Sequence, residues 1–235
     1  MTRADSLAAR LVRVLYSPRA TFEQLVNTPR FVGALVVTFL VTSACATALF
    51  RTEVGQIALL DQWERTAVAF GRTVDDSRYA ALEKASRNDA EVYAIATSFV
   101  TGPVLAVGLS LGFVAAFRLA KMTAPFSQVL AVVAHAGVVL MLRQLVAAPV
   151  TYVRETLASP VTMSIFFTTM DENSPAARFF GIIDLFVMWW LVVLAIGMSV
   201  LYHRSARRLA LMFVGIYVTV AIILAVVMAV MGSAA

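Results

Sequence analysis

Charged residues, cysteine and histidine are scarce in this sequence, and each scarcity excludes a class of protein. Only 14% of the 235 residues are charged, whereas an ordinary soluble domain has about 25%. The single cysteine, Cys45, excludes a disulfide framework within the chain and a zinc site built from cysteines. Two histidines, His135 and His203, are too few for a typical histidine metal site. An HExxH motif and a phosphate-binding glycine loop are also missing, so we predict a non-enzyme with no metal and no cofactor.

Apolar residues, in contrast, are abundant. They make up 60% of the sequence and the mean hydropathy is +0.84, whereas soluble domains contain about 45–50% apolar residues. A membrane span needs about 20 mainly apolar residues, and five stretches qualify: roughly 31–50, 94–117, 126–148, 178–201 and 209–231. The predicted fold class is therefore all-α, a polytopic membrane bundle of about five transmembrane helices. The connection at 149–177 contains SPVTMSIFF, which is too short to span and is expected to be interfacial or re-entrant.

The basic residues indicate how the bundle is oriented. Arginine and lysine gather in residues 1–30 and in the links at 118–121 and 203–208, which all fall on one side of a five-span chain. Short loops rich in arginine and lysine stay on the cytoplasmic side of a membrane. We therefore expect a multi-pass protein of the cell inner (cytoplasmic) membrane, with the N-terminus cytoplasmic and the C-terminus outside. The net charge of +5 then requires no nucleic-acid partner.

Residues 1–30 are predicted to form two cytoplasmic helices ahead of a transmembrane domain at 31–235. The apolar residues of the first helix share one face: Leu7, Leu11 and Val14. We weigh equally a helix that lies in the membrane interface and a helix that packs on the rest of the protein. The pair Ser17-Pro18 is a typical helix start and Thr28-Pro29 a typical stop, which predicts a second helix at about 18–27.

Residues 51–93 form a polar insert between the first two spans, and we predict an extracytoplasmic helical hairpin there. Its first helix has apolar residues every three or four positions: Ile57, Leu60, Trp63, Ala67 and Phe70. The stretch GRTVDD interrupts this pattern, and Asp75 or Asp76 offers the N-cap of a second helix. The hairpin either covers the outer end of the bundle or, in a second interpretation, is a docking surface for an extracytoplasmic partner.

One carboxylate, Asp184, interrupts the fourth apolar stretch. A charge in mid-span costs about 2.5–3.5 kcal/mol on insertion scales, so it should face protein or water rather than lipid. We predict an intramembrane polar cluster with Arg143 as the main partner of Asp184 and His135 as the secondary one, because helical rise places Asp184 between the other two in depth. The pair would staple the third and fourth spans. The alternatives are a proton or ion relay through Asp184 and His135, and a water-filled vestibule that holds Asp184 alone.

Small residues spaced four apart predict where the spans pack closely. In the second span the candidate helix-packing residues are Gly108, Gly112 and Ala116. Similar rows begin at Ala34 in the first span and at Ala221 in the fifth. Contacts within one chain are the default explanation, and a homo-oligomer is the alternative. Ser110 and Ser199 also lie in spans, but neither has an evident base beside it, which argues against an intramembrane hydrolase.

Three segments of the chain together match a known pattern. YSPRATFEQLVNTPRF at 16–31 contains Ser-Pro-x-x-x-Phe, QVLAVVAHAG lies at 128–137, and IIDLFVMWWLVVLAIGMS at 182–199 contains Asp-x-Phe-x-x-Trp followed by Ala-x-Gly-x-Ser. In this order they resemble the bacterial branch of the Yip-domain (Rab-interacting-protein-like) family of integral membrane proteins. The resemblance implies a multi-span helical domain with a cytoplasmic N-terminus, and no activity that could be transferred. His135 stands where an aromatic residue is commoner in that family, and the large hairpin points to a specialised part.

The preferred interpretation is a non-catalytic integral membrane protein that acts as a partner or organiser of another membrane complex, such as an exporter. We expect its partners to be membrane lipids and a membrane protein, contacted through the hairpin at 53–92 and the amphipathic N-terminal helix. The alternative is a small transporter or channel-like protein that uses Asp184 and His135.

Overall fold

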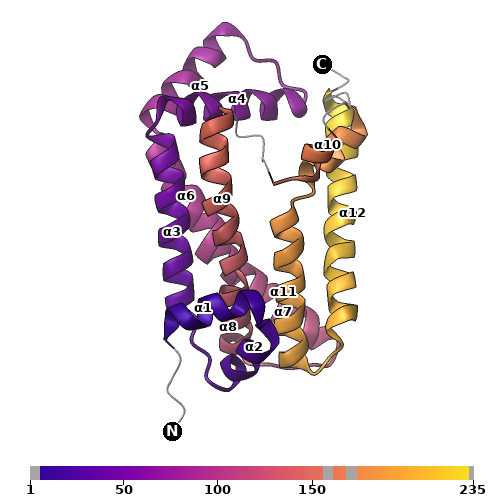
Figure 1. Cartoon of the computed structure of the whole chain (residues 1–235). Coiled ribbons are helices and arrows are strands. Elements are labelled where there is room, and N and C mark those ends of the chain that lie inside the picture. Colours follow the sequence, from indigo (N-terminus) through magenta and orange to yellow (C-terminus); the bar gives the residue numbers. More distant parts are fainter. Residues whose placement is uncertain (1–5, 156–160, 168–173, 233–235) are drawn as a thin grey trace. The chain divides into compact units, whose positions relative to one another are not determined.

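The computed structural model describes residues 6–155, 161–167 and 174–232, and within them the chain is helical (Figure 1). The helices are α1 (Leu7–Tyr16), α2 (Pro18–Asn27), α3 (Val32–Phe50), α4 (Glu53–Ala69), α5 (Asp76–Asn88), α6 (Ala90–Phe99), α7 (Leu105–Leu119), α8 (Phe126–Ala136), α9 (Val138–Arg154), α10 (Pro175–Ile182), α11 (Leu185–Tyr202) and α12 (Ala206–Gly232). A π-helical turn at Val100–Val104 joins α6 to α7, and a short 3-10 helix spans Met163–Phe166. The all-α fold class is confirmed. The first residues of the SPVTMSIFF stretch and the C-terminal residue lie outside the described residues.

Five helical stretches are long and apolar enough to cross a membrane, in the order predicted. They are Val32–Phe50, Ala90–Leu119, Phe126–Arg154, Leu185–Tyr202 and Ala206–Val230. The second contains Pro103 within its π-helical turn, where the missing amide of proline is accommodated by the wider turn. The third runs past Pro149, which lies inside α9, and is divided at Gly137. Both therefore extend beyond the predicted boundaries.

The chain divides into two compact units, and several helices contribute residues to both. The first unit comprises Met1–Thr42, Thr97–Leu142 and Phe186–Gly215, and the second comprises Ser43–Ala96, Arg143–Leu185 and Ile216–Ala235. Each unit has its own packing.

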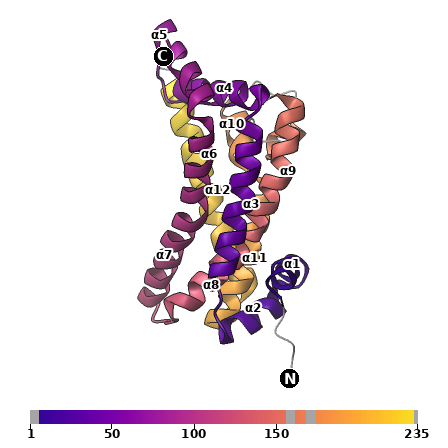
Figure 2. The ribbon, with the colours of Figure 1, turned by 90° about the vertical axis from the view of Figure 1, so that its left-hand side faces the viewer.

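In the first unit, α1 packs against its neighbours. Figure 2 shows α1 and α2 beside α8. Leu11 of α1 shares a buried cluster with Ala34, Ala134 and Val138, so the packed interpretation of the N-terminal helix is confirmed. The opposite face of α1 stays open, with Tyr16 73% exposed. The second helix begins at Pro18 and ends at Asn27, as its proline signals predicted.

In the second unit, α4 and α5 form the predicted helical hairpin. Figure 1 shows α4 lying across the end of α3. The turn between α3 and α4 is tight, because a Cβ added at Gly55 would lie 2.1 Å from the carbonyl oxygen of Leu49. The Asp75 side chain accepts a hydrogen bond from the Arg78 amide at 2.8 Å, which confirms Asp75 as the N-cap of α5.

A small hydrophobic core holds the base of this hairpin. It contains residues of α3, α4 and α6: Ala46, Leu49, Phe50, Leu59, Ala90 and Ala94, with Trp63 and Tyr93 packed against them. The predicted apolar face of α4 is therefore partly wrong, since Ile57 is 54% exposed while Ala58 and Leu59 are fully buried. Packing against the ends of two other helices rotates the inward face by about one residue.

Candidate functional site

Asp184 lies at a break in the fourth predicted span, between α10 and α11. Helix α10 ends at Ile182, the backbone of Ile183 is extended with φ −73° and ψ 105°, and α11 begins at Leu185. The prediction of one continuous helix over 178–201 is therefore wrong, and Asp184 stands at the start of the membrane-spanning helix. A carboxylate is favourable there because the N-terminal end of a helix carries a partial positive charge.

The backbone freed by this break is paired with another segment. Two hydrogen bonds of 2.8 and 3.0 Å join Ile183 and Leu185 to residues 161–163. They form a short antiparallel bridge between Thr162 and Asp184, each of which is 4% exposed. Irregular backbone within a membrane protein is tolerated where it is buried in protein and hydrogen-bonded. The described part of the SPVTMSIFF stretch thus supports the break.

Tyr217 of α12 completes this arrangement, and the sequence analysis missed it. Its hydroxyl donates to the Ile182 carbonyl at 2.7 Å and accepts from the Asp184 amide at 3.0 Å. One side chain therefore satisfies a backbone acceptor and a backbone donor on the two sides of the break. The sequence signal that could have found it is a hydroxyl-bearing ring in an otherwise apolar span, because a buried tyrosine usually finds a hydrogen-bond partner.

The predicted pairing of Arg143 with Asp184 is confirmed. The Nε atom of Arg143, in α9, donates to Oδ2 of Asp184 at 2.5 Å. The Asp184 side chain is 6% exposed and the Arg143 side chain 31% exposed, so the carboxylate is largely removed from solvent. A hydrogen-bonded counter-charge offsets part of the cost of burying a carboxylate. The pair joins α9 to the break before α11, which is the geometry a structural staple requires.

His135, the predicted secondary partner of Asp184, is hydrogen-bonded within its own helix. It is fully buried in α8, and its Nδ1 lies 2.9 Å from the carbonyl oxygen of Ala131 in the same helix. Because a carbonyl can only accept, Nδ1 is the protonated nitrogen. Its Nε2 has no hydrogen-bond partner among the described residues. His135 belongs to the first unit and Asp184 to the second, so the predicted secondary contact between them stays a prediction.

The small residues predicted to pack the second span lie on an open face of α7. Gly108, Gly112 and Ala116 are exposed, and a Cβ added at either glycine would meet nothing within 4 Å. Within the first unit, the described residues do not pack on this face, so the predicted close contact is not formed there. The inward face carries Phe117, which stacks on Tyr202 with ring centroids 3.9 Å apart. Aromatic rings bury more apolar area than glycine, so the face with Phe117 packs inward and the face with the glycines does not. The rows that begin at Ala34 and Ala221 are buried in part: Ala34, Thr38, Ala46, Ala221 and Ala225 are buried, whereas Thr42 and Ala229 are partly exposed.

The same row spells Gly-Leu-Ser-Leu-Gly at 108–112, which is the spacing of a serine nucleophile motif. That motif places its serine on a sharp turn between a strand and a helix, whereas Ser110 lies in the middle of α7. Its buried hydroxyl donates to the Ala106 carbonyl at 2.7 Å. Ser110 is therefore hydrogen-bonded to its own helix and is not presented as a nucleophile.

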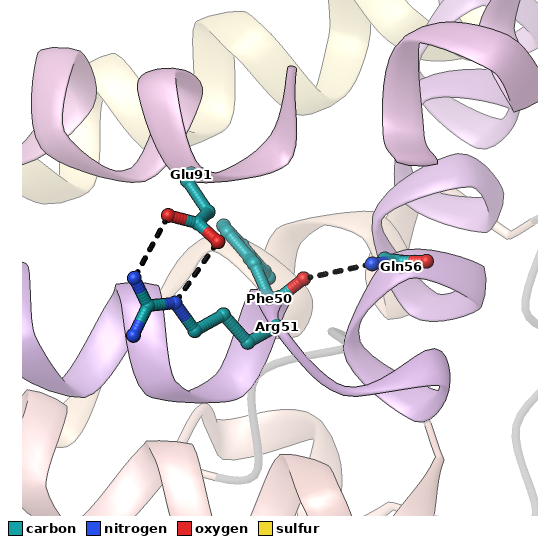
Figure 3. A network of polar contacts seen from close by, with 4 residues as sticks. All are labelled: Phe50, Arg51, Gln56 and Glu91. Carbon is teal, nitrogen blue, oxygen red and sulfur yellow. Dashed lines mark hydrogen bonds and ion pairs between the residues drawn. The ribbon is translucent and has the colours of Figure 1, made fainter. Parts of the chain in front are cut away.

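An ion pair marks the root of the hairpin (Figure 3). Arg51, just after α3, donates to both carboxylate oxygens of Glu91 in α6, at 2.9 and 3.1 Å. On the other side, Gln56 of α4 donates to the Phe50 carbonyl at 3.3 Å and satisfies an acceptor left free at the end of α3. The hairpin is thus tied to the ends of both helices from which it extends.

The three segments that resemble Yip-domain proteins meet in the first unit. Phe22 belongs to the first segment, Val132 to the second and Gly197 to the third. A Cβ added at Gly197 would lie 2.4 Å from Cγ1 of Val132 and 3.1 Å from the ring of Phe22. Phe22 and Val132 are both fully buried. The glycine therefore lets α11 approach α8 and α2 closely, and the three segments form one packed junction.

Comparison with known proteins agrees with this assignment of the segments. The family model described as the Yip1 domain matches residues 12–228, which is most of the chain. No curated protein and no solved structure matches it. The match covers the packed junction, the hairpin, the first four candidate spans and most of the fifth. This multi-pass membrane protein therefore belongs to the Yip1 domain family.

Proposed function

We propose that this chain is a non-catalytic integral membrane protein that acts as a partner or organiser of another membrane complex, such as an exporter. The observation that carries the proposal is the packed junction of Phe22, Val132 and Gly197. The segments that mark the family are used there for close helix packing. A reaction centre or a passage would instead need polar groups that can reach a substrate.

The polar cluster around Asp184 supports the same proposal. Its carboxylate is paired with Arg143, and its amide is bonded to Tyr217. These contacts hold a helix break in place, so the cluster has a structural role that accounts for a costly buried carboxylate.

The hairpin supplies the surface through which such a protein would act. It projects from the ends of α3 and α6, is held at its base by the small hydrophobic core, and is tied at its root by Arg51 and Glu91. The links between the spans at 118–121 and 203–208 are basic, and basic segments stay in the cytoplasm. We therefore propose a cell inner membrane location with the N-terminus in the cytoplasm and the hairpin outside.

The test is purification of the tagged full chain from native membranes in a mild detergent, with mass spectrometry of what accompanies it. We expect a stoichiometric membrane complex that is lost when residues 53–88 are replaced by a short Gly-Ser link. A thermal melt of the shortened protein shows whether the bundle itself stays folded. A chain that is always recovered alone would refute the organiser role.

Transport is the second candidate function, and one observation favours it. His135 is fully buried, yet its Nε2 has no hydrogen-bond partner among the residues that the structure describes. Proteoliposomes with a proton gradient and a pH-sensitive dye distinguish the two functions. Transport predicts flux that Asp184→Asn abolishes and His135→Phe reduces, whereas the organiser role predicts the leak of protein-free vesicles.

A further inference from the structure

The hairpin contains a half-open cleft near its turn, between the end of α4 and the start of α5. The cleft has a volume of about 240 Å³, which is smaller than the roughly 300–1,000 Å³ of small-molecule pockets. Its apolar lining comes from Trp63, Phe70 and Leu82, and two arginines, Arg72 and Arg78, stand at its edge. It can therefore hold one large side chain, but not a whole small molecule.

The charges of the hairpin distinguish these two arginines from the others. Arg51, Arg65 and Arg87 form ion pairs with Glu91, Asp61 and Glu83 at 2.9, 3.0 and 3.0 Å. Arg72 and Arg78 are exposed and have no ion pair among the described residues. Asp75 accepts hydrogen bonds from the Arg78 amide and the Ser77 hydroxyl, not from either guanidinium. Two guanidinium groups at the cleft are thus available to a ligand.

The apolar part of the cleft is presented in a fixed position. Trp63 packs edge-to-face on Tyr93 with ring centroids 5.2 Å apart, and Tyr93 belongs to the core at the base of the hairpin. Phe70 is 39% exposed, although a large aromatic side chain gains free energy when it leaves water. An occupant that covers Phe70 and contacts Trp63 would bury this surface without any rearrangement of the hairpin.

We propose that this cleft binds a peptide segment of a partner protein that presents a carboxylate beside one large apolar side chain. The planar guanidinium groups match a carboxylate, with which arginine forms paired hydrogen bonds. The apolar side chain would lie against Trp63 and Phe70. This inference rests on the proposed organiser function, because it states which chemistry the partner must carry.

Charge favours a peptide over an anionic lipid surface as the occupant. Residues 51–93 carry eight acidic and six basic side chains, so the hairpin as a whole is repelled by an anionic membrane. Three basic side chains of the hairpin have no ion pair among the described residues: Arg72 and Arg78 line the cleft, and Lys84 does not.

Fluorescence anisotropy on the purified full chain tests the inference. The probe is a fluorescein-labelled Gly-Ser octapeptide that carries phenylalanine between two glutamates. Two companion peptides replace the glutamates with glutamine or the phenylalanine with serine. The test variant is Arg72→Gln with Arg78→Gln, and the matched control is Arg65→Gln with Arg87→Gln, which removes the same charge from the same hairpin but from paired arginines.

We expect saturable binding of the probe, weakened about tenfold by the test variant and less than about twofold by the control variant, since exposed ion pairs contribute modestly each. Both companion peptides should bind more weakly than the probe. Absence of binding, equal weakening by both variants, or Arg72- and Arg78-dependent binding to phosphatidylglycerol vesicles in place of the peptide would overturn the proposal.

The two proposals can fail separately. If a membrane complex accompanies the wild-type chain and the Arg72→Gln, Arg78→Gln variant equally, the cleft proposal is wrong and the organiser role stands. If the peptide binds through these arginines but no complex is ever recovered, the organiser role is wrong, and the cleft remains a peptide site with a different purpose.

Discussion

At the scale of single residues, Gly197 is the position where the family's packed junction has least room. A Cβ there would lie 2.4 Å from Val132, whose short side chain is fully buried and cannot move far. Overpacking of this kind costs about 1–3 kcal/mol. We therefore expect Gly197→Ala to lower the thermal stability of the detergent-purified chain, measured by the temperature at which half of it leaves the monodisperse peak.

Two further variants check this explanation. Gly108→Ala adds the same methyl group where nothing lies within 4 Å, so it should not lower the melting temperature. Combining Gly197→Ala with Val132→Ala makes room for the new methyl group and should recover part of the loss. If the double variant melts at the sum of the two single losses, the contact between these residues is not the cause.

Tyr217 supports two backbone groups with one hydroxyl, which makes it sensitive to a very small change. Tyr217→Phe keeps the ring but leaves the Ile182 carbonyl and the Asp184 amide without this partner. A buried polar group that loses its partner costs about 1–3 kcal/mol. We expect a clear fall in thermal stability, whereas Tyr152→Phe, at a 52% exposed position, should change little. Equal melting of both variants would show that the hydroxyl is dispensable.

The ion pair of Arg143 and Asp184 has a more specific signature than loss of stability. Asp184→Leu leaves a partly buried guanidinium without its counter-charge, and removal of one partner of a buried pair costs about 3–5 kcal/mol. Replacing both residues, Asp184→Leu with Arg143→Met, removes the unpaired charge and should restore much of the folded yield. The staple hypothesis fails if Asp184→Leu alone leaves folded yield and thermal stability unchanged.

At the scale of helices, the N-cap of α5 makes the hairpin sensitive to acid. The backbone amide of Arg78, and then the Ser77 hydroxyl, donate to the Asp75 carboxylate and hold its pKa below the ordinary value. A carboxylate with a lowered folded pKa contributes stability above its unfolded pKa of about 3.9 and loses it as pH falls through the folded pKa. The start of α5 should therefore lose amide protection in acid.

Hydrogen exchange at residues 76–80, corrected for the intrinsic pH dependence of exchange, measures this effect. Asp75→Asn keeps a good N-cap but does not titrate, so its protection should not vary with pH over the same range. If the asparagine variant loses protection in acid to the same extent as the wild-type chain, titration of Asp75 is not the cause.

Elements with strong local signals could be predicted from the sequence, and elements set by distant contacts could not. Proline and serine define α2 over Pro18–Asn27, and Asp75 caps α5 as predicted. The break before α11 was missed because a hydropathy window averages over it, and because its hydrogen-bond partners lie at residues 161–163 and at Tyr217. The inward face of α7 was missed for a similar reason, since Phe117 contacts a ring far along the chain.

At the scale of the whole molecule, the distribution of charge between the two sides of the membrane decides the orientation of the five spans. With five spans, the N-terminal segment and the links at 118–121 and 203–208 share one side, and the hairpin lies on the other. The N-terminal segment and the two links are basic, whereas the hairpin carries more acidic than basic residues. Because basic segments stay in the cytoplasm, the cleft proposed above would face an extracytoplasmic partner.

The single cysteine allows this topology to be measured directly. In a Cys45→Ser background, Ser77→Cys places one thiol on the exposed start of α5, and Ser205→Cys places one in the exposed link between α11 and α12. A membrane-impermeant maleimide added to intact cells should label position 77 and leave position 205 unlabelled until the membrane is opened. Labelling of position 205 alone would invert the proposed orientation, and labelling of both positions would contradict an odd number of spans between them, because residues 77 and 205 are separated by the second, third and fourth spans.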